Sequence, residues 1–124
     1  MRFCRRVFFL AGLYGFAVLL PLYFAEGLVG RLVPPEVTHP EFYYGFVGGA
    51  LAWQVVYLLV ALEPLRLQPL IVLSALAKLG LVVAVALLVE EGRTSLLFAV
   101  PVMGDLVFGL LFLYAYALVR RAAA

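Results

Sequence analysis

The chain has 124 residues, of which 67% are apolar and 13% are charged, and its formal net charge is +2. Four long apolar segments leave no stretch from which a water-soluble domain could be built. Each segment is long enough to cross a hydrocarbon layer of about 30 Å as a helix. The apolar runs are continuous and do not alternate, which favours helices over a membrane barrel. We therefore predict an all-α integral membrane four-helix bundle, with residues 1–124 in a single domain.

The first predicted membrane helix covers residues 7–25 and follows the basic segment MRFCRR. Its apolar run is longer than that of a secretory signal peptide, and no small-x-small cleavage pattern precedes Glu26. We therefore expect it to remain as a membrane helix, with a kink at Pro21. Cys4 is interpreted as an inert thiol, and lipidation or redox chemistry is the weaker alternative.

Residues 26–41 form the longest connection, which we predict to lie outside the membrane and to be stiffened by Pro34 and Pro35. At its end, Thr38 and Glu41 have the spacing of a helix-capping box. The alternative is a proton or ligand site at the outer mouth, formed by His39, the only histidine, with Glu36 or Glu41. We predict no metal site, because one histidine and no usable cysteine do not provide three or four ligands.

The second predicted helix covers residues 42–62 and has small residues on one side. Gly45 and Gly49 form a small-xxx-small pair, with Gly48 on the same side, which is typical of close helix contact. The helix is therefore predicted to be central in its bundle or shared with a second copy. Trp53 is interpreted as a core residue or as the lining of a ligand cavity.

The third and fourth predicted helices cover residues 69–89 and 96–119. The turns before and after the third helix are short, which makes the last three helices antiparallel neighbours. Gly92 is the predicted residue just past the end of the third helix, and Thr94 or Ser95 is the predicted N-cap of the fourth.

Arginine placement predicts the orientation. With the N-terminus in the cytoplasm, two arginines lie outside, Arg31 and Arg93. The other six lie inside, namely Arg2, Arg5, Arg6, Arg66, Arg120 and Arg121. This excess satisfies the positive-inside rule and puts both termini on the cytoplasmic side.

Lys78 is the only lysine and lies in the middle of the apolar run Pro69–Val89. A charge at that depth costs several kcal/mol unless it is paired, and such residues are functional-site hypotheses by default. Asp105 is the predicted partner, because a depth count puts both residues near one level. Lys78 lies 11 residues, roughly 16 Å, below the outer end of its helix, and Asp105 lies nine residues, roughly 13 Å, below the outer end of the next.

Gln54, Ser74 and Trp53 are the further residues of this predicted ligand-binding or buried polar layer. Gln54 is expected to join it from the second helix, at a depth of roughly 18 Å. Ser74 lies on the Lys78 face one turn nearer the cytoplasm, and Gly109 lies one turn beyond Asp105, where it would let a neighbouring helix approach. The layer is interpreted as a structural ion pair that fixes the bundle register, or as a ligand-binding or proton-handling site.

Three stretches of the chain resemble a group of small, uncharacterised four-helix bacterial membrane proteins: HPEFYYGFVGGALAWQVVYLL (His39–Leu59), ALAKLG (Ala75–Gly80) and GDLVFGLLFLYAY (Gly104–Tyr116). More distantly, the chain is similar to DoxX-like four-helix membrane proteins, some of which accompany redox enzymes. The resemblance implies the four-helix layout and carries over no activity and no site residue. This chain has no redox-active cysteine pair.

The sequence contains no Ser-His-Asp spacing, CxxC motif, phosphate-binding loop or paired-histidine haem signature, so we predict no catalytic residue and no cofactor. The first expectation is a protein of the bacterial inner membrane that binds a lipid-like or quinone-like molecule, or an accessory subunit of a homodimer or larger membrane complex. The alternatives are a small dimeric transporter, a proton-coupled carrier or an intramembrane enzyme. The lipid bilayer is an expected partner and nucleic acid is not. The sequence has eight arginines, one lysine and no asparagine, a composition that favours a thermophilic source.

Overall fold

The computed structural model describes residues 1–33 and 35–124, with the backbone alone at Phe98. Over those residues the chain forms α1 (Arg2–Leu19), η1 (Leu20–Phe24), α2 (Glu26–Leu32), α3 (Pro40–Leu62), α4 (Gln68–Glu90) and α5 (Leu96–Ala123). Four helical stretches are long and apolar enough to cross a membrane: Arg2–Phe24, Pro40–Leu62, Gln68–Glu90 and Ala99–Ala123. The predicted all-α fold with four long apolar helices is confirmed.

The first helix differs from its prediction at both ends. α1 begins at Arg2, so the basic segment is already helical, and at Leu20 the chain changes to the tighter 3-10 helix η1. Pro21 lies in the first turn of η1. Proline has no N–H to donate and clashes with the preceding turn, so an α-helix cannot continue unchanged through it. The predicted kink is therefore a change of helix type.

The connection over residues 26–41 contains α2, a helix that the sequence analysis does not predict. Gly30 is the buried residue of α2, and a Cβ there would lie 3.2 Å from the Cα of Glu36. Glycine thus lets the helix pack closely on the segment that follows it. Pro34, one of the two residues predicted to stiffen this connection, lies outside the described residues.

The predicted capping box at the start of α3 is wrong. The N-cap residue is His39, one position after Thr38, and its side chain forms no capping hydrogen bond. Pro40 explains the shift, because proline is favoured at the first helical position and so makes the residue before it the N-cap.

The end of α4 agrees with the prediction. The N–H of Arg93 donates to the carbonyl of Leu88 at 2.8 Å, and the N–H of Gly92 donates to the carbonyl of Val89 at 3.0 Å. This is a Schellman motif, with Gly92 at a φ of 71° in the left-handed region that glycine adopts without steric cost. Ser95 is the N-cap residue of α5, as predicted, although it makes no capping hydrogen bond.

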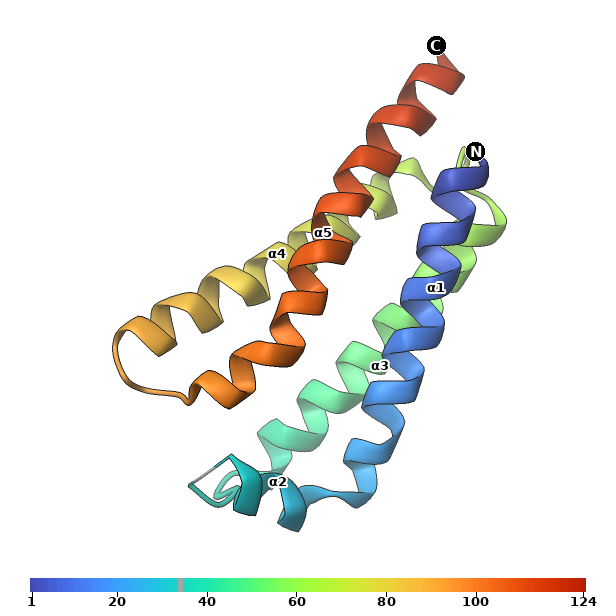
Figure 1. Cartoon of the computed structure of the whole chain (residues 1–124). Helices are drawn as coiled ribbons and strands as arrows, with labels where there is room; N and C mark the ends of the chain where they lie inside the picture. The colour runs from blue at the N-terminus through green and yellow to red at the C-terminus, as the bar shows by residue number, and fades with distance from the viewer. Residues whose placement is uncertain (34) are drawn as a thin grey trace.

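The helices form two antiparallel hairpins, α1 with α3 and α4 with α5 (Figure 1). One end of the molecule holds both chain ends and the turn between α3 and α4, and we call it the terminal end. The opposite end holds α2 and the turn between α4 and α5, and we call it the α2 end. The hairpins meet through α1 and α5, and less through α3 and α4, and they diverge toward the α2 end. The predicted antiparallel order is correct, but α3 and α4 do not pack along their whole length.

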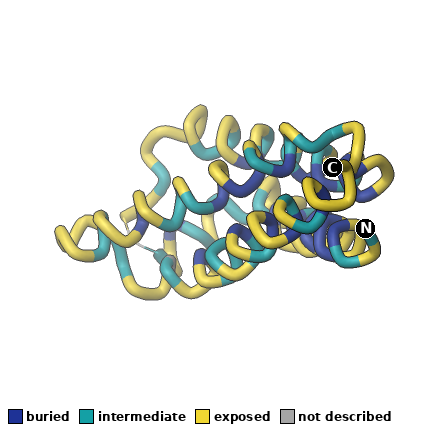
Figure 2. Tube along the Cα trace, turned by 90° about the horizontal axis from the view of Figure 1, so that it is seen from above, coloured by how far each residue is buried: buried dark blue, intermediate teal, exposed yellow. Residues whose placement is uncertain are grey.

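The hydrophobic core cluster lies at the terminal end, where all four long helices contribute to it. Figure 2 shows buried segments gathered near the two chain ends. The buried members of this core cluster are Cys4, Val7, Phe8, Ala11, Tyr57, Val60, Ala61, Ile71, Ala75, Phe112, Ala115 and Val119. Phe8 and Phe112 stack at its centre, with ring centroids 4.1 Å apart. Among the described residues, the core cluster shared by α1, α3, α4 and α5 thus lies in this half of the molecule.

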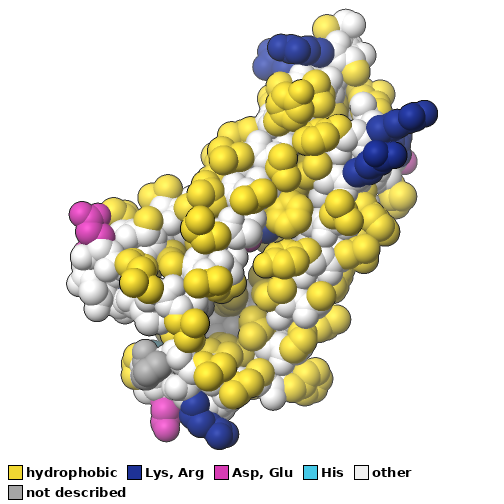
Figure 3. All heavy atoms as spheres, in the orientation of Figure 1, with side chains coloured by type: hydrophobic (Ala, Val, Ile, Leu, Met, Phe, Trp, Pro, Cys, Tyr) yellow, Lys and Arg dark blue, Asp and Glu magenta, His cyan; other side chains and the backbone are white. Residues whose placement is uncertain are grey.

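At the α2 end, polar contacts hold η1 and α2 against the start of α3. The Tyr43 hydroxyl donates to the Leu22 carbonyl at 2.6 Å, and the Tyr44 hydroxyl donates to Glu26 Oε2 at 3.0 Å. Between the two ends, hydrophobic side chains cover the visible face of the molecule (Figure 3). This distribution, with charge at the ends and an apolar belt between them, is typical of a protein whose middle lies in lipid.

Candidate functional site

A buried ion pair joins α4 to α5. Lys78 Nζ donates a hydrogen bond to Asp105 Oδ1 at 2.7 Å. The Lys78 side chain is 9% exposed and the Asp105 side chain is 22% exposed. The distance lies in the range of charge-assisted hydrogen bonds, which are stronger than neutral ones. The pairing predicted from the depth count is confirmed.

Close helix packing brings these two charges together. A Cβ on Gly109, one turn after Asp105, would lie 2.7 Å from Leu79 Cδ2 and 3.5 Å from Lys78 Cβ. The missing side chain lets α4 approach α5 at this level, as the sequence analysis predicts for Gly109.

Two aromatic rings flank the lysine ammonium group. Lys78 Nζ lies 5.3 Å from the ring centroid of Tyr57 on α3 and 5.8 Å from that of Phe108 on α5. A cation is attracted to the negative face of such rings, with about 0.5–2 kcal/mol depending on how far it is desolvated. Neither residue was predicted for this role from the sequence, although Phe108 lies on the Asp105 face of its helix, three residues further on.

Gln54 is buried, but it does not join the pair. Its Nε2 donates to the carbonyl of Ala50 at 2.8 Å, within its own helix. Its Oε1 points at Gly15 on α1, into the space that a side chain there would fill, and finds no hydrogen-bond partner among the described residues. The depth of Gln54 along its helix suggested that its side chain would join the polar layer. The rotation of α3 directs Gln54 toward α1, within its own hairpin and away from the ion pair, so it does not join the pair as predicted.

Ser74 and Trp53, the other residues predicted for the layer, also have different surroundings. Ser74 is fully buried, and its hydroxyl donates to the carbonyl of Leu70 at 2.6 Å, one turn back in α4. Trp53 is half-buried and packs on the core cluster beside Tyr57, with ring centroids 6.3 Å apart. The core interpretation of Trp53 is therefore the one that its contacts support.

An apolar notch continues along the seam between α4 and α5, from the ion pair toward the α2 end. It has a volume of about 280 Å³ and is lined by Val82, Val85, Ala86, Val89, Ala99, Val102, Met103 and Leu106. Val82 follows Lys78 by one turn, and Leu106 follows Asp105 directly. Pro101 lies inside α5 beside the notch. Because proline removes a helix hydrogen bond and disturbs the preceding turn, it favours a local departure of α5 from straight packing.

A second cleft, of about 440 Å³, lies at the α2 end and is lined by Glu26, Gly27, Gly30, Arg31, Glu36 and Val37. His39 and Glu41, the residues predicted for the outer mouth, are not among its lining residues. They are exposed and contact each other, with His39 Nδ1 3.3 Å from Glu41 Oε1. Over residues 1–33 and 35–124, no three His, Cys, Asp or Glu side chains are grouped so that they could hold a metal ion.

The ion pair leaves hydrogen-bonding capacity unused. A lysine ammonium has three donors and a carboxylate has about four acceptor positions. Within the described part of the chain, the contact to Asp105 is the one hydrogen bond of Lys78. The pair can therefore still donate to a carbonyl or hydroxyl oxygen and accept from a hydroxyl group.

Comparison with protein-family models, with curated proteins and with solved structures finds no match for this chain. The resemblance to small four-helix bacterial membrane proteins, and the distant one to DoxX-like proteins, stay predictions.

Proposed function

We propose that the protein is a multi-pass protein of the bacterial cytoplasmic membrane, with both chain ends in the cytoplasm, that binds a lipid-like or quinone-like small molecule. The Lys78–Asp105 pair holds the polar head of this molecule. One observation carries the proposal: the buried pair lies where the core cluster ends and the two hairpins begin to separate. A pair that served packing alone would be expected inside the closed part of the bundle.

The polar head that fits the ion pair best is a neutral carbonyl or hydroxyl group. The pair is already charge-balanced, so a charged head would introduce an unpaired charge into a low-dielectric region. The Asp105 side chain keeps 22% of its surface exposed, which leaves a route for contact. Phe108 beside the lysine is partly exposed and offers a ring face against which a flat head can pack, whereas Tyr57 is buried in the core cluster.

The apolar part of the ligand has room next to the pair. The notch of about 280 Å³ between α4 and α5 begins one turn from Lys78. Figure 3 also shows the surface hollowed between the two hairpins. Ligand sites in helical membrane proteins combine an apolar lining with a few polar groups that fix orientation, and this is the combination present here.

Native mass spectrometry of the protein, extracted gently from its own membrane, tests the proposal. The wild-type protein should retain a small molecule, and the double variant Lys78→Met/Asp105→Leu should lose it while remaining folded. Gly49→Ala is the matched control and should retain the molecule, because residue 49 lies away from the pair. Wild-type protein that carries no small molecule, or a double variant that keeps it, would contradict the proposed function.

A second candidate function, a subunit role, rests on α3. Gly45 and Gly49 are exposed, and an added Cβ at either would meet nothing within 4 Å. The predicted close helix contact at these glycines is thus absent within the described chain, whereas Gly48 lies under Tyr23 Oη. A second copy or a larger membrane protein would complete the contact. The mass spectra above test it, because a dimer lost in Gly45→Leu/Gly49→Leu would support the subunit role.

A further inference from the structure

The charges of the molecule are strongly separated between its two ends. The terminal end holds six arginines and one acidic side chain, namely Arg2, Arg5, Arg6, Arg66, Arg120 and Arg121 with Glu63. The α2 end holds two arginines and five glutamates, namely Arg31 and Arg93 with Glu26, Glu36, Glu41, Glu90 and Glu91. Figure 3 shows basic side chains projecting from the terminal end.

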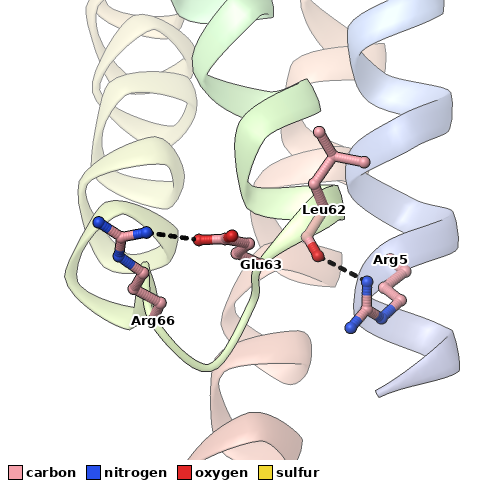
Figure 4. A network of polar contacts seen from close by, with 4 residues as sticks. All are labelled: Arg5, Leu62, Glu63 and Arg66. Atoms are coloured by element: carbon pink, nitrogen blue, oxygen red, sulfur yellow. Dashed lines mark hydrogen bonds and ion pairs between the residues drawn. The ribbon is translucent and has the colours of Figure 1, made fainter.

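Two of the six arginines at the terminal end have structural partners (Figure 4). Arg5 Nη1 donates to the Leu62 carbonyl at 2.7 Å, which satisfies a free carbonyl at the end of α3. Arg66 Nη1 lies 3.1 Å from Glu63 Oε2. This pair also engages Glu63, the one acidic side chain of the terminal end, so no acidic side chain is left there for the other arginines.

The remaining four arginines, Arg2, Arg6, Arg120 and Arg121, are exposed, and none forms an ion pair within the described residues. They lie at the same end of two neighbouring helices. Cys4 and Val119 are fully buried members of the core cluster, and the Phe3 and Tyr114 rings meet at 5.1 Å. α1 and α5 are therefore in contact near this end, with Arg2 and Arg6 on the first turns of α1 and Arg120 and Arg121 on the last turn of α5.

We propose that these four arginines form a binding surface for the head groups of anionic phospholipids. A guanidinium group matches a phosphate with two parallel hydrogen bonds. Basic residues at the membrane surface attract anionic lipids over about one Debye length. The proposal rests on the membrane location proposed above, and it does not depend on a ligand at Lys78 and Asp105.

A lipid fits this surface better than a soluble anion. Just beyond the arginines, α1 and α5 expose large apolar side chains, with Phe9, Leu10 and Tyr114 51%, 58% and 57% exposed. A phospholipid contacts both surfaces at once, because its phosphate reaches the guanidinium groups while its acyl chains lie along the apolar side chains.

The test measures the melting temperature of the purified protein in micelles with added phosphatidylglycerol or phosphatidylcholine. Phosphatidylglycerol should raise it by several degrees and phosphatidylcholine by much less, because a lipid that binds the folded state stabilises it. The variant Arg2→Gln/Arg6→Gln/Arg120→Gln/Arg121→Gln should lose most of the difference in melting temperature between the two lipids. The variant Arg120→Gln/Arg121→Gln should lose about half of it. High salt should reduce the difference in the wild-type protein.

The matched control is Arg31→Gln/Arg93→Gln, which removes the two arginines of the α2 end and should keep the full difference. The Lys78→Met/Asp105→Leu variant should also keep it, which separates this surface from the proposed ligand site. The proposal would be overturned by equal effects of both lipids, by a difference that survives in the fourfold variant, or by inorganic phosphate alone reproducing the stabilisation.

Discussion

The two ends of this molecule are built from the same four apolar helices but pack differently. At the terminal end, all four helices share one core, and Phe8, Ile71 and Phe112 are completely buried in it. Toward the α2 end, each hairpin packs on itself, with Val47 buried in the first and Val85 and Val102 in the second. The same four apolar helices run through both halves, so the difference comes from which side chains face the neighbouring hairpin.

The Lys78–Asp105 pair marks the boundary between these halves. On its terminal side, Tyr57 connects it to the core cluster. On its other side, the notch between α4 and α5 begins. The contrast teaches that a hydrophobic run specifies a membrane helix, whereas the residues at the contact faces specify where a bundle closes. The substitutions below test this contrast, from the largest expected effect to the smallest.

The pair itself should give the largest effect. Lys78→Met or Asp105→Leu alone leaves one buried charge without its partner, and each should lower the free energy of unfolding by about 3–5 kcal/mol. The double variant should recover most of this loss, because it removes both desolvated charges. Denaturant or thermal unfolding in micelles measures all three. If the double variant is no more stable than the less stable of the two single variants, the two charges do not act as a pair.

Truncating α4 in each half should give unequal effects. Ile71→Ala opens a cavity in the core cluster and should cost about 2–5 kcal/mol. Leu87→Ala, on the same helix toward the α2 end, removes a side chain that is 53% exposed and should change stability by less than about 0.5 kcal/mol. The same unfolding measurement compares them. Equal losses would mean that the α2 end is as tightly packed as the terminal end.

Two glycine substitutions sharpen the comparison between a contact face and an open face. Gly15→Ala puts a methyl group where the Gln54 side chain lies, and should cost about 1–3 kcal/mol through overpacking. Gly49→Ala meets open space and should be neutral or stabilising by up to about 1 kcal/mol, because alanine favours helix. Both proteins can be compared by melting temperature in the same micelles. A destabilised Gly49→Ala that is also monomeric would argue against an open face at that position.

Much of the candidate site could be predicted because depth along a membrane helix is a simple count. Lys78 and Asp105 each lie a known number of residues from a helix end, and the short turn between their helices forces them side by side. Gly109 could be predicted for the same reason, since it lies one turn from Asp105. For Gln54 the depth was near that of the pair, but its direction was not determined, because a count gives height and not the rotation of a helix about its axis.

The amino-acid sequence by itself determined the four apolar helices, the glycine end of α4, the ion pair between α4 and α5, and the separation of charge between the two ends. Each depends on spacing within one helix or across one short turn, and the charge separation on composition at the helix ends. Only the tertiary structure decided that the hairpins close at one end and separate at the other, that Gln54 contacts Gly15, and that Tyr57 and Phe108 flank the lysine. The physical reason is that these contacts depend on how a nearly uniform apolar surface rotates and tilts against its neighbours, and many faces of such a surface are equally apolar.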